Sequence, residues 1–254
     1  MTQRVVITGA SSGIGAALAR EYARRGATLG LLARREQALQ ELLRGLACPA
    51  AAYPVDVRDA TAVSMAARDF HAKFGGADIV IASAGVSAGT STERAEDRSV
   101  FKEILDINVI GMVNTFAPFV AQMRAVSSGT LVGIASVAGF RGLPGAGAYS
   151  ASKAAAITYL ESLRVELHGS GVAVVTICPG YIATPMTEKN PYPMPFLMPA
   201  DQAAHRMARA IDRRKRFTVI PWQMSVVGAL LKMTPRPLYD ALFAKAPRKP
   251  ARDG

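Results

Sequence analysis

A tyrosine and a lysine stand four positions apart in a stretch whose apolar spacing predicts a helix over residues 149–168. Residues at positions i and i+4 share one face of a helix, so Tyr149 and Lys153 would lie side by side. A phenol has a reference pKa of about 10, and a nearby ammonium favours the phenolate and lowers that value. The pair suits proton transfer to a carbonyl oxygen, although this spacing is also common in plain surface pairs.

A serine precedes this pair along the chain. Ser136 follows a predicted strand over residues 130–135 and lies 13 residues before Tyr149. Its hydroxyl would be placed to bond a substrate oxygen and to stabilise the charge that develops on it. Ser136, Tyr149 and Lys153 are therefore the candidate catalytic residues.

A glycine-rich turn near the start of the chain predicts a phosphate-binding site. The turn follows a strand over residues 4–8 and opens a helix over residues 14–25, so free helix N–H groups and close backbone approach would favour a pyrophosphate. A merely tight strand–helix turn is the alternative. The segment reads Thr8-Gly9-Ala10-Ser11-Ser12-Gly13-Ile14-Gly15.

The end of the second predicted strand, residues 28–33, indicates which dinucleotide is bound. A carboxylate there would accept from a ribose 2′-OH, but this chain has Ala33-Arg34-Arg35. Guanidinium groups suit the 2′-phosphate of NADPH, so NADPH is favoured over NADH. The alternative is that Arg34 and Arg35 only begin a solvated helix, which is the more plausible for Arg35.

Short apolar runs alternate with helical patterns along most of the chain. Such alternation predicts an α/β fold, a doubly wound parallel sheet of the Rossmann type with helices on both faces, formed by residues 1–254 as one domain. The predicted strands are 4–8, 28–33, 78–83, 130–135 and 172–177, and the predicted helices are 14–25, 36–46, 61–74, 98–124 and 149–168.

Together these motifs resemble the compact form of the short-chain dehydrogenase/reductase family over residues 3–185. The resemblance implies about seven strands, the last near residues 217–220, and a homodimer or homotetramer assembled through the helices at 98–124 and 149–168. It rests on Thr8-Gly9-x-x-x-Gly13-x-Gly15, Asp56-Val57, Asn108, Ser136, Tyr149-x-x-x-Lys153 and Pro179-Gly180.

The resemblance also implies roles for individual residues. Tyr149 would be the acid–base residue, Lys153 would depress its pKa and bond the nicotinamide ribose, and Asn108 would anchor a water that links Lys153 to solvent. The implied cofactor-binding set is Gly9, Ser11, Ser12, Gly13, Ile14, Gly15, Arg34, Arg35, Asp56, Val57, Ala84, Gly85, Tyr149, Lys153, Pro179, Gly180, Ile182 and Thr184.

One segment departs from the family pattern. After its fourth strand the family usually has Asn-Asn-Ala-Gly or Asn-Ala-Gly, whereas this chain has Ala82-Ser83-Ala84-Gly85. The missing amide removes a bond that braces the sheet, and we expect Ser83 to replace it in part.

Residues 185–216 are predicted to form a substrate lid and the helix that follows it. The lid is rich in Pro, Met and aromatic residues, which suits an apolar, adaptable pocket for a lipophilic ketone or aldehyde; simple packing of the lid is the alternative. The candidate substrate residues are Phe140, Leu143, Met186 and Tyr192. Lys189 and Arg141 are the candidate partners for a charged substrate.

The chain has 254 residues, half of them apolar, a formal net charge of +11, two cysteines and no secretory signal pattern. Two cysteines argue against a disulfide scaffold or a structural zinc site, so we predict free thiols and no metal. Twelve of the 30 Lys and Arg residues lie beyond residue 204, and half of these twelve lie in a basic, apolar extension over residues 221–254. This extension either contacts an anionic membrane surface or packs on the body or a second subunit.

The sequence as a whole predicts a cytoplasmic enzyme, peripheral to the membrane if the extension binds lipid. Its reaction would be the reduction of a carbonyl to an alcohol by hydride transfer from NADPH, with no specific nucleic-acid partner. Two rival functions stay open: an NAD-dependent alcohol dehydrogenase with the same site, and an NADPH-binding regulatory or membrane-associated protein without turnover.

Overall fold

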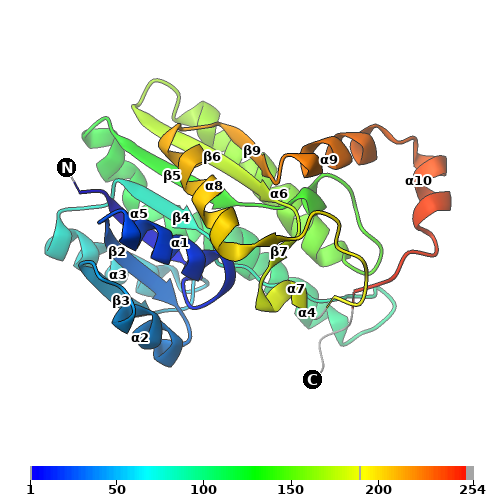
Figure 1. Cartoon of the computed structure of the whole chain (residues 1–254), viewed down its shortest axis with the longest axis horizontal. Coiled ribbons are helices and arrows are strands. Elements are labelled where there is room, and N and C mark those ends of the chain that lie inside the picture. The colour runs from blue at the N-terminus through cyan, green and yellow to red at the C-terminus, as the bar shows by residue number, and fades with distance from the viewer. Residues whose placement is uncertain (1, 189, 250–254) are drawn as a thin grey trace.

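The computed structural model describes residues 2–188 and 190–249, which form one seven-stranded parallel sheet with helices on both faces (Figure 1). The strand order is β3-β2-β1-β4-β5-β6-β9, which confirms the predicted doubly wound architecture. The strands are β1 (Arg4–Thr8), β2 (Thr28–Ala33), β3 (Ala50–Pro54), β4 (Ile79–Ala82), β5 (Gly129–Ile134), β6 (Val172–Pro179) and β9 (Phe217–Ile220), with a separate pair β7 (Ile182–Ala183) and β8 (Met198–Pro199).

The residue pattern had not predicted strand β3. Its sequence begins with three alanines, which have low strand propensity, and none of its residues is fully buried because it lies at the sheet edge. Its pairing with β2 therefore depends on the tertiary fold, and local pattern alone gives no signal for it.

The helices agree with the predicted ones except at one point. The predicted helix 98–124 is interrupted by a π-helical turn, η1 (Asp106–Ile110), which carries Asn108. Such turns are rare and often lie at functional sites. The helices are α1 (Gly13–Arg24), α2 (Glu36–Arg44), α3 (Ala60–Phe74), α4 (Asp97–Leu105), α5 (Gly111–Ala125), α6 (Gly147–Glu166), α7 (Pro185–Glu188), α8 (Ala200–Asp212), α9 (Gln223–Met233) and α10 (Arg236–Phe243).

Two apolar cores lie on opposite faces of the sheet. Alternate residues of a strand point to opposite faces, so Val5 and Ile7 join the core beneath α1, α2 and α8, while Val6 joins the core beneath α3, α5 and α6. The strands are almost continuously apolar because both faces are covered.

The helical stretch Asp97–Ala125 is long and apolar enough to cross a membrane by length and composition. Phe116, Phe119 and Met123 from this stretch are buried in the core against the sheet. Packing inside the protein therefore accounts for part of its apolar character, since 44% of the apolar window is buried.

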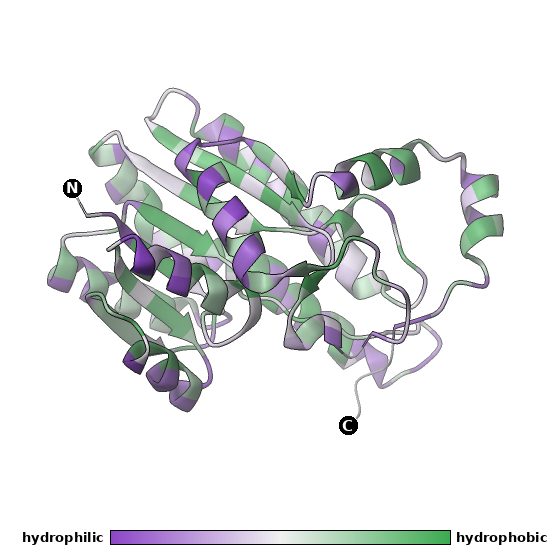
Figure 2. Ribbon diagram, viewed as in Figure 1, coloured by the Kyte–Doolittle hydropathy of each residue, from purple (hydrophilic) through white to green (hydrophobic). Residues whose placement is uncertain are grey.

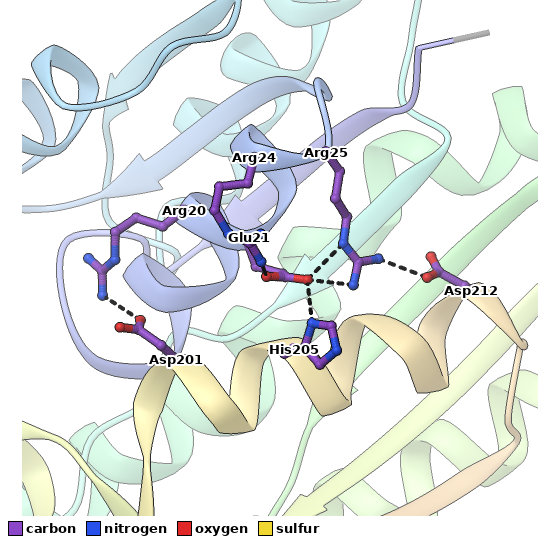
Figure 3. Close-up of polar contacts among 7 residues, drawn as sticks. All are labelled: Arg20, Glu21, Arg24, Arg25, Asp201, His205 and Asp212. Carbon is purple, nitrogen blue, oxygen red and sulfur yellow. Dashed lines mark hydrogen bonds and ion pairs between the residues drawn. The ribbon is translucent and has the colours of Figure 1, made fainter.

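A cluster of charged residues joins α1 to α8 (Figure 3). The Glu21 carboxylate is only 5% exposed and accepts hydrogen bonds from Arg24 and from Arg25, whose Nε lies 2.8 Å away. His205 Nδ1 of α8 lies 3.0 Å from the same carboxylate. Burial alone would raise the pKa of Glu21, but the hydrogen bonds from Arg25, His205 and Arg24 together lower it. The cluster therefore ties the first helix to the helix after the lid.

Residues 221–249, which we call the C-terminal arm, extend away from the sheet through α9 and α10 and then return toward it (Figure 1). Figure 2 shows green, hydrophobic segments on the ribbons of both helices, and several large apolar side chains of the arm are exposed to solvent. The exposed ones are Trp222, Val226, Leu230, Met233, Leu238 and Leu242.

Candidate active site

The glycine turn between β1 and α1 is shaped by close backbone contacts. Gly9 has a φ of +68°, and a Cβ on it would lie 2.7 Å from the Ala84 Cα. A Cβ on Gly15 would lie 2.3 Å from the Gly9 carbonyl oxygen. No residue larger than glycine fits at either position, so the turn brings bare backbone to the N-terminus of α1. The geometry suits a pyrophosphate, as predicted from the sequence.

Two arginines lie beside this turn, at the end of β2. Arg35 donates from Nη2 to the Ser11 hydroxyl at 3.1 Å, and Arg34 Nη1 lies 3.9 Å from the Asp56 carboxylate. A bidentate contact with Arg58 is the main cause that holds the pKa of Asp56 below its usual value. Because Arg58 already neutralises Asp56, the half-exposed Arg34 guanidinium is available to a phosphate.

The three candidate catalytic residues converge at the other end of the same cavity. Ser136 Oγ accepts from the Ala138 N–H at 3.1 Å and lies 3.4 Å from the Pro179 carbonyl oxygen. Burial raises the pKa of the Tyr149 phenol, and the neighbouring Ser136 hydroxyl acts in the opposite direction. The phenol is therefore protonated at neutral pH and can act as a proton donor.

Lys153 is only 5% exposed and donates from Nζ to the Ile134 carbonyl oxygen at 2.8 Å. Its ammonium lies 5.7 Å from the centroid of the Tyr149 ring. Burial lowers the pKa of Lys153 to about 8. Burial is the largest influence on the pKa of both Tyr149 and Lys153. The sequence instead predicted that the Lys153 ammonium would mainly lower the pKa of Tyr149.

Close packing fixes the catalytic residues relative to one another. A Cβ on Gly139 would lie 2.7 Å from the Lys153 carbonyl carbon, and a Cβ on Gly133 would lie 2.3 Å from the Leu160 Cδ1. The loop that carries Ser136 and the helix that carries Tyr149 and Lys153 therefore touch through backbone.

Asn108 is fully buried and does not line the cavity. Its amide accepts from the Val86 N–H at 2.8 Å, donates to the Val86 carbonyl at 3.0 Å and donates to the Ser152 hydroxyl at 2.9 Å. A Cβ on Gly85 would touch both Asn108 Oδ1 and Lys153 Nζ, so the amide lies close to the ammonium. The water that Asn108 was expected to anchor stays a prediction.

The unusual segment after β4 is braced by Thr8, in place of the expected Ser83. Thr8 Oγ1 accepts from the Ala84 N–H at 3.4 Å and lies 3.5 Å from the Ile81 carbonyl. The Ser83 hydroxyl makes no hydrogen bond with the described residues, so the expectation that it replaces the missing amide was wrong. Ser83 instead lines the cavity.

One cavity of about 340 Å³ runs from the glycine turn to Tyr149. Every residue of the predicted cofactor-binding set lines it, together with Ser136. The prediction missed several small or apolar lining residues that carry no chemical signal in a sequence. Those residues are Ala33, Val55, Ser83, Val86, Ile107, Ile134, Ala135, Pro185 and Thr187.

The predicted substrate residues divide into two groups. Met186 lines the cavity, and Tyr192 packs edge-on against Tyr181 near Tyr149. Phe140 instead stacks on Phe217, and a Cβ on Gly228 of α9 would meet its ring at 2.4 Å, so Phe140 supports the C-terminal arm. Leu143 does not line this cavity either.

Neither of the two predicted partners for a charged substrate, Lys189 and Arg141, is among the described residues that line the cavity. Lys189 lies outside the described residues. Arg141 donates to the carbonyls of Leu231 and Thr234, at 3.1 and 2.9 Å, and therefore holds the end of α9. Sequence analysis did not identify Lys249, whose Nζ lies 5.7 Å from the Tyr149 ring centroid.

Cys48 and Cys178 are both free, as predicted, and no cluster of three or more metal-binding side chains occurs among residues 2–188 and 190–249. The bare backbone of the glycine turn and the arginines beside it are the features of the cavity that fit a nucleotide cofactor.

Comparison with known proteins agrees with this geometry. The family model for short chain dehydrogenases matches residues 3–193, so the chain belongs to that family of oxidoreductases. It is 41% identical to an uncharacterized oxidoreductase of Myxococcus xanthus, over 93% of this chain and 94% of that one.

Solved structures resemble the whole chain. A short-chain dehydrogenase from Sphingobium yanoikuyae in complex with NADPH matches with a TM-score of 0.77 and 26% identity, over 99% of each chain. A family member from Burkholderia phymatum in complex with NAD matches with a TM-score of 0.83 and 24% identity, over 99% of this chain and 98% of that one. The fold is thus shared with proteins that hold either nicotinamide cofactor.

Proposed function

We propose that this protein is an NADPH-dependent reductase that converts a ketone or aldehyde to the alcohol. The observation that carries the proposal is the single cavity that joins the glycine turn, Arg34 and Arg35 to Ser136, Tyr149 and Lys153. A cofactor site and a proton donor that share one cavity are what hydride transfer to a carbonyl requires.

A bound NADPH would supply the hydride. The chain's own residues would bind and orient the reactants: the backbone of the glycine turn and the N-terminus of α1 hold the pyrophosphate, and Arg34 pairs with the 2′-phosphate. Ser136 donates to the carbonyl oxygen and holds it toward Tyr149. Tyr149 then gives its phenolic proton to that oxygen, and Lys153 stabilises the phenolate that remains.

We infer a substrate with apolar character, because Met186 lines the cavity and Tyr192 lies near Tyr149.

We also propose a cytoplasmic homo-oligomer. Exposed apolar side chains on α4 and α6, Phe101 and Val165, favour helix-mediated association of the kind the family resemblance implies. The exposed apolar faces of α9 and α10 beside basic residues are the features that would favour contact with an anionic membrane.

The test is NADPH oxidation with a series of ketones and aldehydes of rising chain length, repeated with NADH and with Tyr149→Phe. Loss of the proton donor should lower kcat by about 10²- to 10⁴-fold while NADPH still binds. Equal rates in the wild type and Tyr149→Phe would overturn the proton-donor role.

The cofactor choice is tested separately with Arg34→Ala. Removal of a charged hydrogen-bond donor should raise KM for NADPH by about 10- to 100-fold and leave KM for NADH nearly unchanged. A wild type that prefers NADH would instead favour the rival function, an NAD-dependent alcohol dehydrogenase.

A further inference from the structure

The C-terminal arm is fastened to the loop between β5 and α6. The Arg141 guanidinium, which bonds the last carbonyls of α9, also lies 4.2 Å above the Tyr239 ring of α10. The Tyr239 hydroxyl in turn donates to the Gly142 carbonyl at 2.6 Å. These contacts connect both helices of the arm to the loop that follows Ser136, which directs the rest of the arm back toward the active site.

The returning end of the arm brings Lys249 to the catalytic tyrosine. A Cβ on Gly145 would lie 3.2 Å from the Arg248 Cα, so the backbone of the arm packs directly on the loop. Lys249 Nζ donates to the Ser87 hydroxyl at 2.7 Å and lies 5.7 Å from the Tyr149 ring centroid. Two lysines from distant parts of the chain thus lie at the same distance from that ring.

Lys249 carries a charge that the rest of the described chain does not neutralise. Its polar contact is with the neutral hydroxyl of Ser87, and no ion pair joins it to a described carboxylate. It is partly buried, and burial lowers the pKa of its ammonium. A partly buried cation that no described carboxylate neutralises favours the arrival of an anion.

We propose that Lys249 binds an anionic group of the substrate, so that the substrate is a ketone or aldehyde that also carries a carboxylate or a similar anion. The carbonyl would lie against Tyr149 and Ser136 and the apolar part against Met186, all of which line the cavity. Lys249 and Ser87 are not among the described residues that line it, so the anion would extend beyond the cavity to reach them. This inference rests on the proposed reductase activity and specifies the substrate class of that site.

The alternative is a purely structural role, in which Lys249 only holds the arm against Ser87. The two roles differ in what they do to substrate choice. A pinning residue affects charged and neutral substrates alike, whereas an anion-binding residue changes only the discrimination between them.

The experiment compares oxo acids with their methyl esters, at several separations of carbonyl and carboxylate, in the wild type and in Lys249→Met. Methionine keeps the apolar stem of the side chain and removes the charge. We expect the wild type to prefer at least one acid over its ester, and Lys249→Met to lower kcat/KM for that acid by about 10- to 100-fold, with the ester unchanged. Lys249→Arg should keep most of the preference.

Lys245→Met is the matched control, because Lys245 is an exposed lysine of the same arm whose side chain makes no hydrogen bond or ion pair with the described residues. Its kinetics should equal those of the wild type with both kinds of substrate.

The outcomes separate this inference from the proposed function. If Tyr149-dependent reduction of the neutral esters occurs but no acid is preferred, or if Lys249→Met changes acids and esters equally, the anion site is overturned and the reductase stands. If neither class of compound is reduced by the wild type, both proposals fall.

Discussion

The glycine turn at the start of the chain and the C-terminal arm both border the active site, but they are held in place in different ways. At the turn, backbone touches backbone, and a single added Cβ on Gly9 would overlap Ala84. The arm is held by the side chains of Arg141, Tyr239 and Lys249 and by close packing at Gly145 and Gly228, while its helices expose apolar surface. The cofactor end is therefore fixed by contacts between backbone atoms, whereas the substrate end depends largely on side-chain contacts.

The largest effect is expected from an added methyl group in the turn. Gly9→Ala combines a left-handed backbone with a clash against Ala84, so it should destabilise the fold by about 3 kcal/mol and greatly weaken binding of NADPH. Gly26→Ala is the control: Gly26 has a φ of +75° and no atom within 4 Å of its Cβ position, so about 1 kcal/mol is expected. Urea denaturation of both variants measures the difference, and equal losses would contradict the steric account.

The buried lysine should set the alkaline limit of the activity. Because burial lowers the pKa of Lys153 to about 8, its cationic form is lost as the pH rises through that value. We therefore expect kcat/KM for NADPH to be constant below about pH 8 and to fall tenfold per pH unit above it. Lys153→Arg keeps the charge at all these pH values, so its residual activity should lack this limb. If kcat/KM instead begins to fall only near the ordinary lysine pKa of about 10.4, burial of Lys153 does not set the alkaline limit.

The ion cluster between α1 and α8 contributes to stability at the cofactor end. Glu21→Gln removes the charge that holds Arg25 and should lower the free energy of unfolding by about 2 kcal/mol at neutral pH. The folded protein lowers the pKa of Glu21 from its ordinary value of 4.5, so the stabilisation is present above that pH and disappears as the pH falls through the lower folded value. Thermal unfolding of wild type and variant should converge in acid; a difference that persists there would contradict the linkage.

The smallest effect is expected at the arm. Tyr239→Phe removes the hydroxyl that donates to Gly142, which costs about 1 kcal/mol and acts only on the arm. Hydrogen exchange should accelerate over residues 236–249 and stay unchanged in the sheet. Faster exchange at the sheet would mean that the arm stabilises the whole domain.

The cofactor end could be read from the sequence because its chemistry is local. A glycine turn after one strand and two arginines at the end of the next are placed together by the pairing of those two strands. All the predicted cofactor residues do line one cavity. Strand β3 gave no such signal, since its alanines pair only because the fold places them beside β2.

The substrate end could not be read in the same way. Phe140 is apolar and lies near Ser136 in the sequence, but its packing against Gly228 depends on where the arm returns. Lys249 contacts Ser87 across 162 positions of sequence, and no local pattern encodes that distance. Local pattern therefore indicates only a basic tail near the end of the chain, although Lys249 of this tail lies 5.7 Å from the ring centroid of the catalytic tyrosine.

The backbone contact between Gly139 and Lys153 has a consequence for how this protein can change over generations. A side chain on Gly139 would displace the backbone of Lys153, so Ser136, Tyr149 and Lys153 cannot shift independently and are inherited almost as a unit. The exposed residues of the arm lie outside that constraint. New substrates should therefore arise, in nature or in laboratory selection, through substitutions in residues 221–249 that leave the reaction itself untouched.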